Sequence, residues 1–231
     1  MEYVYHMGNL RIVDLTKLLD PKTETRRCHL VRFNTGGRIP DFHTNMDLMS
    51  HLGTHCECPY HHRDDWPSVA ELPLTTFFGR AIYVTIPSSA VKPNGYVTPA
   101  LLEAYCAPLM KDDDIVILDS DYKFPPFTPK TNSPEDKRLF VNGETADWFE
   151  KHHAKCIGFG DGVSIENREE DVKPFHDILL EKNIVFLEVL QHLELLKENT
   201  FFMSYAPLPI MGLDSCPVRA YAIEGLPGFT K

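Results

Sequence analysis

The sequence lacks the long apolar run that a membrane-spanning helix requires. No stretch of its 231 residues approaches the ~18–20 consecutive apolar residues that cross a bilayer. Its start also lacks the basic-then-apolar order of a secretory signal. Basic residues are in the minority, with 23 Lys and Arg against 33 Asp and Glu and a formal charge of -10. Because such a surface repels phosphate backbones and anionic lipid, we expect neither a nucleic-acid partner nor a membrane partner.

Disulfides are not needed to hold this chain together. With 43% hydrophobic residues it can build a full core, unlike the small secreted domains that depend on disulfides. We therefore expect a cytoplasmic protein whose six cysteines are reduced thiols. One alternative is that Cys56 and Cys58 are thiolate ligands of a structural zinc ion, but the second closely spaced pair that such a site normally uses is missing.

Helical and strand patterns alternate along the chain, which predicts an α/β fold in a single domain over residues 1–231. The segment 119–137 contains four prolines and little periodicity, so it is expected to be a loop that serves as a cover, an oligomer contact or a flexible insertion. The expected elements are strands at 10–15, 81–86 and 115–118, a helix that starts at Pro99 with Thr98 as its N-cap, and a helix at 144–153.

The first chemical cluster is HLGTHCECPYHH, residues 51–62. Four metal-capable side chains stand at odd positions: His51, His55, Glu57 and His61. In a straight strand His51 and His55 would lie about 13 Å apart, too far to share one ion, and glycine and proline oppose a helix here. A bend at Gly53 and a second one after Glu57 would reconcile the spacing. The stretch is therefore predicted to be a folded metal-binding loop, and a polar turn is the alternative.

A second cluster joins His176 and Glu188. A short helix at 174–182 followed by a strand at 184–190 would return the carboxylate to the level of the histidine. Glu188 stands among apolar residues, and a charge buried there is costly unless it is paired or bound to metal. The alternative is an edge strand with Glu188 facing solvent.

These residues together resemble the cyclase-like metal hydrolases, the family of bacterial kynurenine formamidase and isatin hydrolase. The hallmark of that family is H-x-G-[TA]-H-x-D-x-P-x-H, and residues 51–61 read HLGTHCECPYH. His176 and Glu188 match the family's later His and Glu at the same twelve-residue separation. The resemblance extends from about residue 10 to residue 225.

The resemblance implies a swivelling β/β/α fold with mixed sheets, a site for one or two ions, and homodimers or homotetramers. By motif position, His51, His55 and Glu57 would hold the first ion. Glu57 and Glu188 would bridge to a second ion, which His176 would complete. His61 would transfer protons, with His62 as a spare candidate for that task.

Two positions depart from the family pattern. Glu57 stands where the family has Asp, which moves the carboxylate about one carbon–carbon bond further out. Arg26 stands where the kynurenine formamidases carry a pocket tryptophan, which argues for an anionic small-molecule substrate because guanidinium matches carboxylate. The alternative is that Arg26 is an ordinary surface residue.

The ligand set determines the chemistry. Imidazole and carboxylate suit Zn²⁺ or Mn²⁺, and a bound cation lowers the pKa of water to ~7, so that hydroxide can attack a carbonyl. With His61 as proton shuttle, this predicts hydrolysis of a non-peptide amide, either N-formyl or cyclic. The alternatives are a non-catalytic metal- or ligand-binding member of the family and a zinc-thiolate structural protein. Asp214 and Arg219 are expected to form a structural ion pair.

Overall fold

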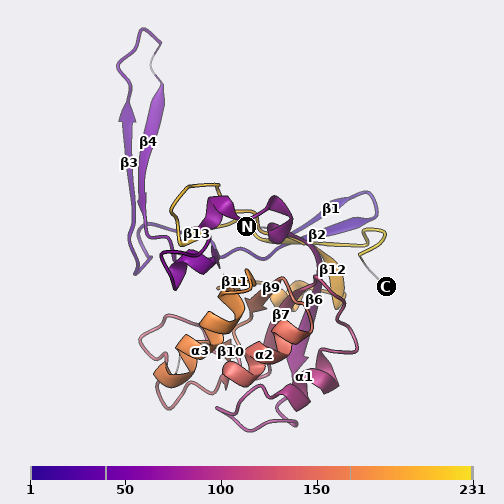
Figure 1. Ribbon diagram of the computed structural model, residues 1–231. Coiled ribbons are helices and arrows are strands. Elements are labelled where there is room, and N and C mark those ends of the chain that lie inside the picture. Colours follow the sequence, from indigo (N-terminus) through magenta and orange to yellow (C-terminus); the bar gives the residue numbers. More distant parts are fainter. Residues whose placement is uncertain (1, 40, 167, 230–231) are drawn as a thin grey trace.

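The computed structural model describes residues 2–39, 41–166 and 168–229. Its three α-helices and fourteen strands alternate along much of the chain (Figure 1). The strands are β1 Val4–Met7, β2 Leu10–Asp14, β3 Cys28–Asn34, β4 Phe42–Leu48, β5 His55–Glu57, β6 Phe78–Ile86, β7 Ile115–Ser120, β8 Leu139–Phe140, β9 Cys156–Phe159, β10 Val163–Ser164, β11 Val185–Glu188, β12 Thr200–Ser204, β13 Ser215–Pro217 and β14 Tyr221–Glu224. The helices are α1 Pro99–Tyr105, α2 Gly143–Lys151 and α3 Glu169–Leu180, and short 3-10 turns follow β5 and precede β6.

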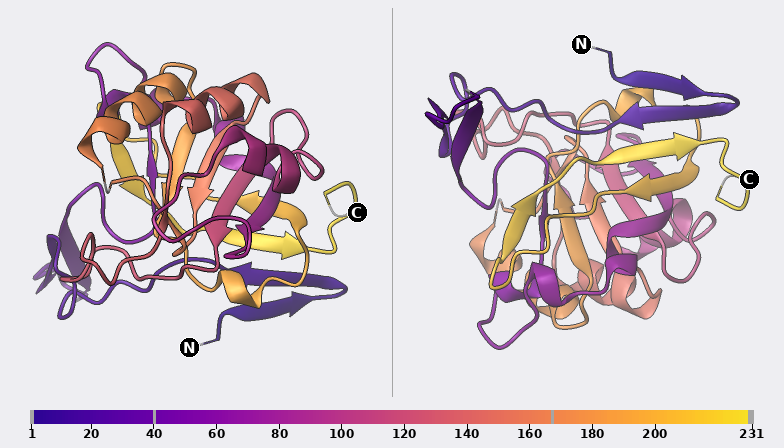
Figure 2. Two further views of the ribbon diagram at one scale, coloured as in Figure 1. Left: turned by 90° about the horizontal axis from the view of Figure 1, so that it is seen from below. Right: turned by 90° about the horizontal axis from the view of Figure 1, so that it is seen from above.

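A mixed ten-stranded sheet organises the described part of the chain, in the order β1-β2-β14-β12-β6-β7-β9-β11-β5-β13. Its centre, β6-β7-β9-β11, is parallel, and the flanking pairs are antiparallel. The three helices cover one face of this sheet (Figure 2). The fold is therefore mixed α/β, as the sequence predicts.

The sheet separates two hydrophobic cores. Val116 and Leu118 of β7 face the helices, together with Trp148 and Phe149 of α2. Their neighbours Ile115 and Ile117 face the opposite core, because side chains alternate along a strand. Because β7 is a central strand buried on both faces, its residues are apolar at successive positions, and the sequence shows this continuous apolar run.

The expected elements form, with differences at their ends. Thr98 caps α1 by accepting from the backbone N–H of Leu101. The strand predicted to end at residue 118 runs through Ser120, so the proline-rich loop begins two residues later than 119.

The prediction that a helix starts at Pro174 is wrong. α3 begins at Glu169 and carries Pro174 in its interior. Three acidic residues occupy its first turn, where they interact favourably with the positive end of the helix dipole. This stabilisation extends the helix upstream of the proline.

β3 and β4 form a separate antiparallel pair that projects from the body (Figure 1). We call residues 27–49 the arm. Over the described ranges, no helix is both long and apolar enough to cross a membrane.

Candidate metal centre

The loop that follows the arm bends at Gly53, as the sequence predicts. Gly53 has φ +60°, and a Cβ atom at this position would lie 2.5 Å from Cδ2 of Leu19. Only glycine combines that conformation with that space. The bend places His51 and His55 beside each other, with ring centroids 5.1 Å apart, so the 13 Å separation of a straight strand is avoided.

The short strand β5 carries His55 and Glu57 into the middle of the protein. It pairs with β11 on one side, where His55 lies opposite Glu188, and with β13 on the other. Glu188 is buried, and β11 is an interior strand of the sheet. The alternative of a solvent-facing Glu188 on an edge strand is therefore excluded.

Two buried polar atoms lack a hydrogen-bond partner among the described residues, Nε2 of His55 and Oε1 of Glu57. Nδ1 of His55 is bonded to the carbonyl oxygen of Gly53 at 2.7 Å, so its Nε2 carries the free lone pair. That Nε2 lies 3.7 Å from Oε2 of Glu188. Buried polar atoms are rarely left without a partner, so this gap is itself an indication of a ligand.

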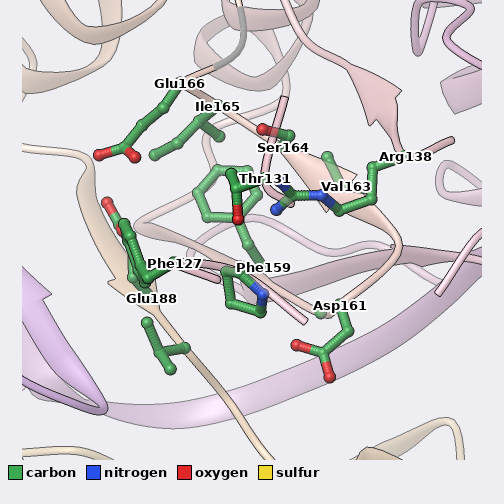
Figure 3. Close-up of a pocket in the computed structure, with 13 residues that line it drawn as sticks. Phe127, Thr131, Arg138, Phe159, Asp161, Val163, Ser164, Ile165, Glu166 and Glu188 are labelled. Atoms are coloured by element: carbon green, nitrogen blue, oxygen red, sulfur yellow. The ribbon is translucent and has the colours of Figure 1, made fainter. Parts of the chain in front are cut away.

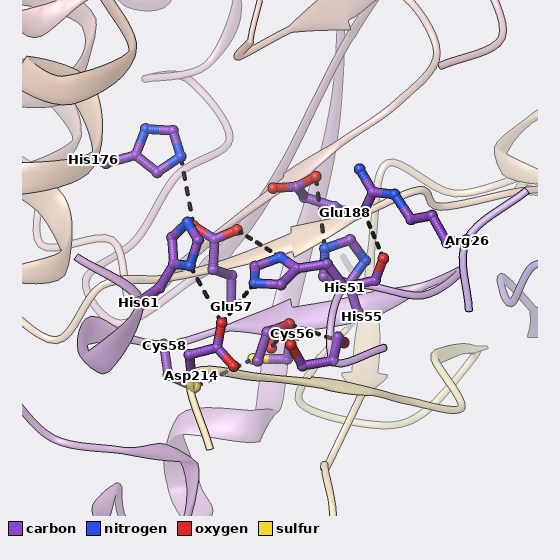
Figure 4. Close-up of polar contacts among 12 residues, drawn as sticks. Arg26, His51, His55, Cys56, Glu57, Cys58, His61, His176, Glu188 and Asp214 are labelled. Carbon is purple, nitrogen blue, oxygen red and sulfur yellow. Dashed lines mark hydrogen bonds and ion pairs between the residues drawn. The ribbon is translucent and has the colours of Figure 1, made fainter. Parts of the chain in front are cut away.

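The second cluster converges on the same point (Figure 4). Nε2 of His176 lies 3.5 Å from Oε1 of Glu57, while its Nδ1 donates to the carbonyl oxygen of Val172 at 2.6 Å. His176 and Glu188 thus both reach the 51–57 loop, as the helix–strand geometry predicts. The structure brings all five predicted ligands together.

His51 and His61 complete the polar ring around Glu57. Nδ1 of His51 lies 3.5 Å from Oε2 of Glu57, and Nε2 of His61 lies 3.6 Å from its Oε1. Two sets of potential ligand atoms result: His51, Glu57 and His61 form one, and His55, Glu57 and Glu188 form the other, each with its atoms within 4.8 Å of one another.

Asp214 contacts the two more exposed histidines of the ring, His51 and His61. Its Oδ2 lies 2.8 Å from Nε2 of His51 and 3.4 Å from Nδ1 of His61. If both nitrogens donate to this carboxylate, the opposite nitrogens, Nδ1 of His51 and Nε2 of His61, are the ones that face Glu57. Carboxylates commonly orient metal-binding histidines in this way.

The prediction that Asp214 and Arg219 pair with each other is therefore wrong. Arg219 pairs with Asp14 instead. Glu166 was also missed: it lines the pockets beside Glu188 and beside His61. The segments 161–166 and 206–219 show a weaker resemblance to the family, but neither pattern gives these two residues a role, because each becomes part of the site only through folding.

Burial changes the pKa of the cluster in a direction that suits a cation. It lowers the pKa of His55 and of His176 to about 4, so both rings are neutral near pH 7. Burial, together with Glu188, raises the pKa of Glu57 well above its usual range. Neutral imidazoles offer lone pairs, and the raised pKa of Glu57 reflects two buried carboxyl groups with no positive charge between them, which a divalent cation would supply. The residues fit a divalent cation.

Cys56 and Cys58 point away from this centre. They alternate with His55 and Glu57 along the chain and pack in the hydrophobic core on the other side of β5, with their sulfurs 4.0 Å apart. All six cysteines are free and buried. The thiolate-zinc alternative therefore has no support in the geometry.

Arg26 lies at the rim of the centre rather than on open surface. Its Nη1 donates to the carbonyl oxygen of His51 at 2.5 Å, and its guanidinium carbon lies 4.1 Å from the centroid of the Phe127 ring. Arg26, Lys17 and Phe127 line a cleft of about 390 Å³.

Phe127 also lines the narrower pocket of about 40 Å³ shown in Figure 3, together with Glu166 and Glu188. Phe127 belongs to the proline-rich 121–137 loop, which also contributes Pro126 to both pockets. The structure thus places this loop against the candidate centre.

The chain has a mixed α/β fold with a buried His/Glu cluster formed by β5, β11 and α3. The chain belongs to the cyclase family: the family model described as "Putative cyclase" matches residues 13–167. This confirms the resemblance seen in residues 51–61.

Solved structures share the fold over nearly the whole chain. An isatin hydrolase A from Ralstonia solanacearum is 22% identical with a TM-score of 0.74, over 94% of this chain and 92% of that one. Isatin hydrolase A from Labrenzia aggregata, bound to benzyl benzoate, is 22% identical with a TM-score of 0.70, over 94% of each chain. A structure titled as a potential metal-dependent hydrolase with cyclase activity is 20% identical with a TM-score of 0.67, over 94% and 100%.

Proposed function

We propose that this protein is a divalent-metal-dependent hydrolase that cleaves a non-peptide amide, either an N-formyl or a cyclic amide. The observation that carries the proposal is the pair of unpartnered buried atoms, Nε2 of His55 and Oε1 of Glu57. Both belong to a ring of imidazoles and carboxylates that converges from distant parts of the chain. The hydrolase names of structures with the same fold support the reaction type.

The residues around the centre have distinct roles in the proposed reaction. His51, His55, Glu57, His176 and Glu188 hold one or two ions, either Zn²⁺ or Mn²⁺. A divalent cation bound there lowers the pKa of water towards ~7 and polarises a carbonyl group. His61 is the most exposed of the histidines around Glu57, so it can exchange a proton with a substrate nitrogen.

Arg26 gives the proposal its substrate class, an amide that carries a carboxylate. Its guanidinium has five N–H donors, and the described residues give it one hydrogen bond, to a backbone carbonyl, and no ion pair. Phe127 beneath it supplies an apolar wall. Together they line a cleft that His51 also lines.

The homodimer or homotetramer that the family resemblance implies remains part of the proposal, as does a location in the cytoplasm. Neither enters the chemistry of the centre.

The decisive experiment measures metal content and turnover on the same preparations. Metal-free protein is reloaded with Zn²⁺ or Mn²⁺ and assayed on isatin, N-formyl amines and small lactams, each with and without a carboxylate. We expect loaded wild type to turn over one of these classes, and Glu57→Gln and His55→Ala to lose both metal and rate. The non-catalytic alternative predicts tight metal binding with no turnover, and full activity of both variants would contradict the proposal.

A further inference from the structure

Two residues beside the candidate centre have an unusual backbone conformation. Among the described residues, eight that are not glycine have positive φ, and six of these are Asn, Asp or His, the types that tolerate this conformation best. The other two are Phe127 and Val189, each with φ +56°. Bulky and β-branched residues rarely adopt this conformation, and those that do cluster at active sites and ligand-binding sites, where their surroundings hold them in place.

Phe127 and Val189 each line both cavities at the centre. One cavity is the cleft of about 390 Å³ that Arg26 also lines, and the other is the pocket of about 40 Å³ that Glu188 also lines (Figure 3). Among the described residues, only Pro126 shares this double position. These three residues therefore form the boundary between the cleft and the pocket.

Val189 is fixed to the metal-binding loop. Its carbonyl oxygen accepts a hydrogen bond from Oγ1 of Thr54 at 2.7 Å, and Thr54 directly precedes His55 in the sequence. Val189 itself directly follows Glu188 and is buried. The hydrogen bond from Thr54 thus holds the unusual backbone of Val189 at a fixed place beside two of the predicted metal ligands.

Phe127 is held at the centre by Arg26. The proline-rich loop is anchored at Phe124 and at Asp136, whose backbone groups form hydrogen bonds to residues outside the loop. Between these anchors, the described residues 125–135 form hydrogen bonds only within the loop. The contact of the Phe127 ring with the guanidinium of Arg26, at 4.1 Å, therefore positions the ring. The residue proposed to bind the substrate carboxylate also places one wall of the pocket.

The two cavities suit different parts of a substrate. The cleft combines the guanidinium of Arg26 with the face of Phe127, so it suits a carboxylate-bearing part with an apolar body. The pocket has room for about three water-sized groups, since each needs roughly 10–15 Å³. Its wall includes the apolar side chains of Phe159, Val163 and Ile165. It therefore suits a short acyl chain.

We propose that Phe127 and Val189 are specificity-determining residues that limit the acyl part of the substrate to a short chain. This inference rests on the proposed amide hydrolysis and narrows its substrate class to short N-acyl amides whose amine part carries a carboxylate. The carboxylate lies at Arg26, and the acyl chain enters the pocket beside Glu188. A longer chain meets the ring of Phe127 and the side chain of Val189.

The first test measures kcat/KM of the metal-loaded protein on the N-formyl, N-acetyl and N-butanoyl derivatives of meta-aminobenzoate. We expect wild type to prefer the formyl over the butanoyl compound by about 100-fold or more, because one methylene group in a tight pocket changes the rate about 10–200-fold. Phe127→Ala should reduce this ratio about 10-fold or more, and Val189→Ala should reduce it in the same direction.

Phe124→Ala is the matched control for the first test. It removes an aromatic ring from the same loop, but Phe124 lines neither cavity, so this variant should keep the wild-type ratio. A Phe127→Ala protein with the wild-type ratio, or an equal change in Phe124→Ala, would overturn the proposal.

The second test needs no turnover, so it separates this inference from the proposed function. In ketone analogues of the acetyl and butanoyl compounds, CH₂ replaces the amide N–H and no bond can be hydrolysed. Calorimetry measures Kd for wild type, Phe127→Ala and Phe127→Gly. We expect wild type to bind the butanoyl ketone about 10-fold or more weakly than the acetyl ketone, and both variants to bind the two ketones about equally.

Phe127→Gly guards the second test against a folding defect, because glycine adopts positive φ without strain. Absence of turnover together with the expected binding pattern would contradict the proposed function alone. If wild type binds neither ketone, binds both equally, or shares its preference with both variants, the assignment of Phe127 is refuted.

Discussion

Nε2 of His51 lies 2.8 Å from Oδ2 of Asp214, although 163 positions separate the two residues in the sequence. The same carboxylate oxygen lies 3.4 Å from Nδ1 of His61. One side chain from the C-terminal segment therefore orients a proposed metal ligand and the proposed proton-transfer residue at once.

Replacement of Asp214 by Asn should weaken metal binding without abolishing it. The amide keeps the shape but loses the charge that fixes the protonated nitrogen of His51, and such outer partners are typically worth about 10–100-fold in metal affinity. Competition with a chromogenic chelator measures the effect. Asp65→Asn, which removes an exposed carboxylate that pairs with Arg63, should leave the affinity unchanged. Equal affinities for both variants would remove Asp214 from the site.

His61 and His62 are neighbours with different expected roles. His61→Gln should retain metal and lose about 10²–10⁴-fold in kcat, the usual contribution of a proton-transfer group. His62 stacks on His176 with centroids 4.7 Å apart and bonds to Asp177, so His62→Gln should lose much less. Metal analysis alongside kinetics distinguishes the roles, since loss of metal in His61→Gln would make His61 a ligand instead.

Arg26→Gln should affect substrates according to their charge. A charge-assisted hydrogen bond to a carboxylate contributes about 1.5–3 kcal/mol, so KM for a carboxylate-bearing amide should rise about 10–100-fold. KM for a neutral analogue should change little. Arg27→Gln is the matched control, because the Arg27 side chain is 67% exposed on the arm. A similar change for both kinds of substrate would argue against anion recognition.

Gly53→Ala should destabilise the fold more than Gly212→Ala does. Both residues have positive φ, +60° and +74°, but a Cβ atom at Gly53 would meet Leu19 whereas nothing lies within 4 Å at Gly212. The conformational cost alone is about 1–2 kcal/mol, and the clash adds to it only at Gly53. Urea unfolding of the metal-free proteins gives both free energies of unfolding. Equal losses would mean that the bend at Gly53 tolerates a side chain.

The raised pKa of Asp161 predicts that the free energy of unfolding depends on pH. Burial, and then the nearby Asp119, raise its pKa to about 6. Because the folded pKa lies above that of the unfolded chain, the folded state binds this proton more tightly, and the associated stability is lost as the pH rises from about 4 through 6. Asp161→Asn removes this pH-dependent loss. Relative to wild type, its free energy of unfolding should rise by about 1–2 kcal/mol when the pH is raised from 4.5 to 7.5. Urea unfolding of both proteins at the two pH values measures this change. If the difference in free energy of unfolding between variant and wild type does not depend on pH, the raised pKa of Asp161 is contradicted.

The sequence was sufficient for those parts of the site that depend on spacing and local conformation. Residues 51–61 carry their ligands, their glycine and their proline in one stretch, and the helix–strand return between His176 and Glu188 follows from rise per residue. The environment of Glu188 could not be settled in this way, because it is buried by β9 and β5, which are remote in sequence.

Asp214 was assigned wrongly for the same reason. Its nearest charge along the chain is Arg219, but the turn into β13 directs it towards the 51–61 loop while Arg219 pairs with Asp14. The local sequence does not show towards which element each of two nearby charged residues points. The sequence does not predict the early start of α3 either, because proline is most common in the first turn of a helix, whereas here it lies inside one.

β5 is only three residues long, and both of its neighbours, β11 and β13, come from the last quarter of the chain. During synthesis the imidazoles and carboxylate of the early loop therefore leave the ribosome long before the strands that fix them. Capture of the proposed ion would then follow synthesis of these strands, and a nascent chain that stalls before β13 carries the side chains of β5 without one of its two neighbouring strands.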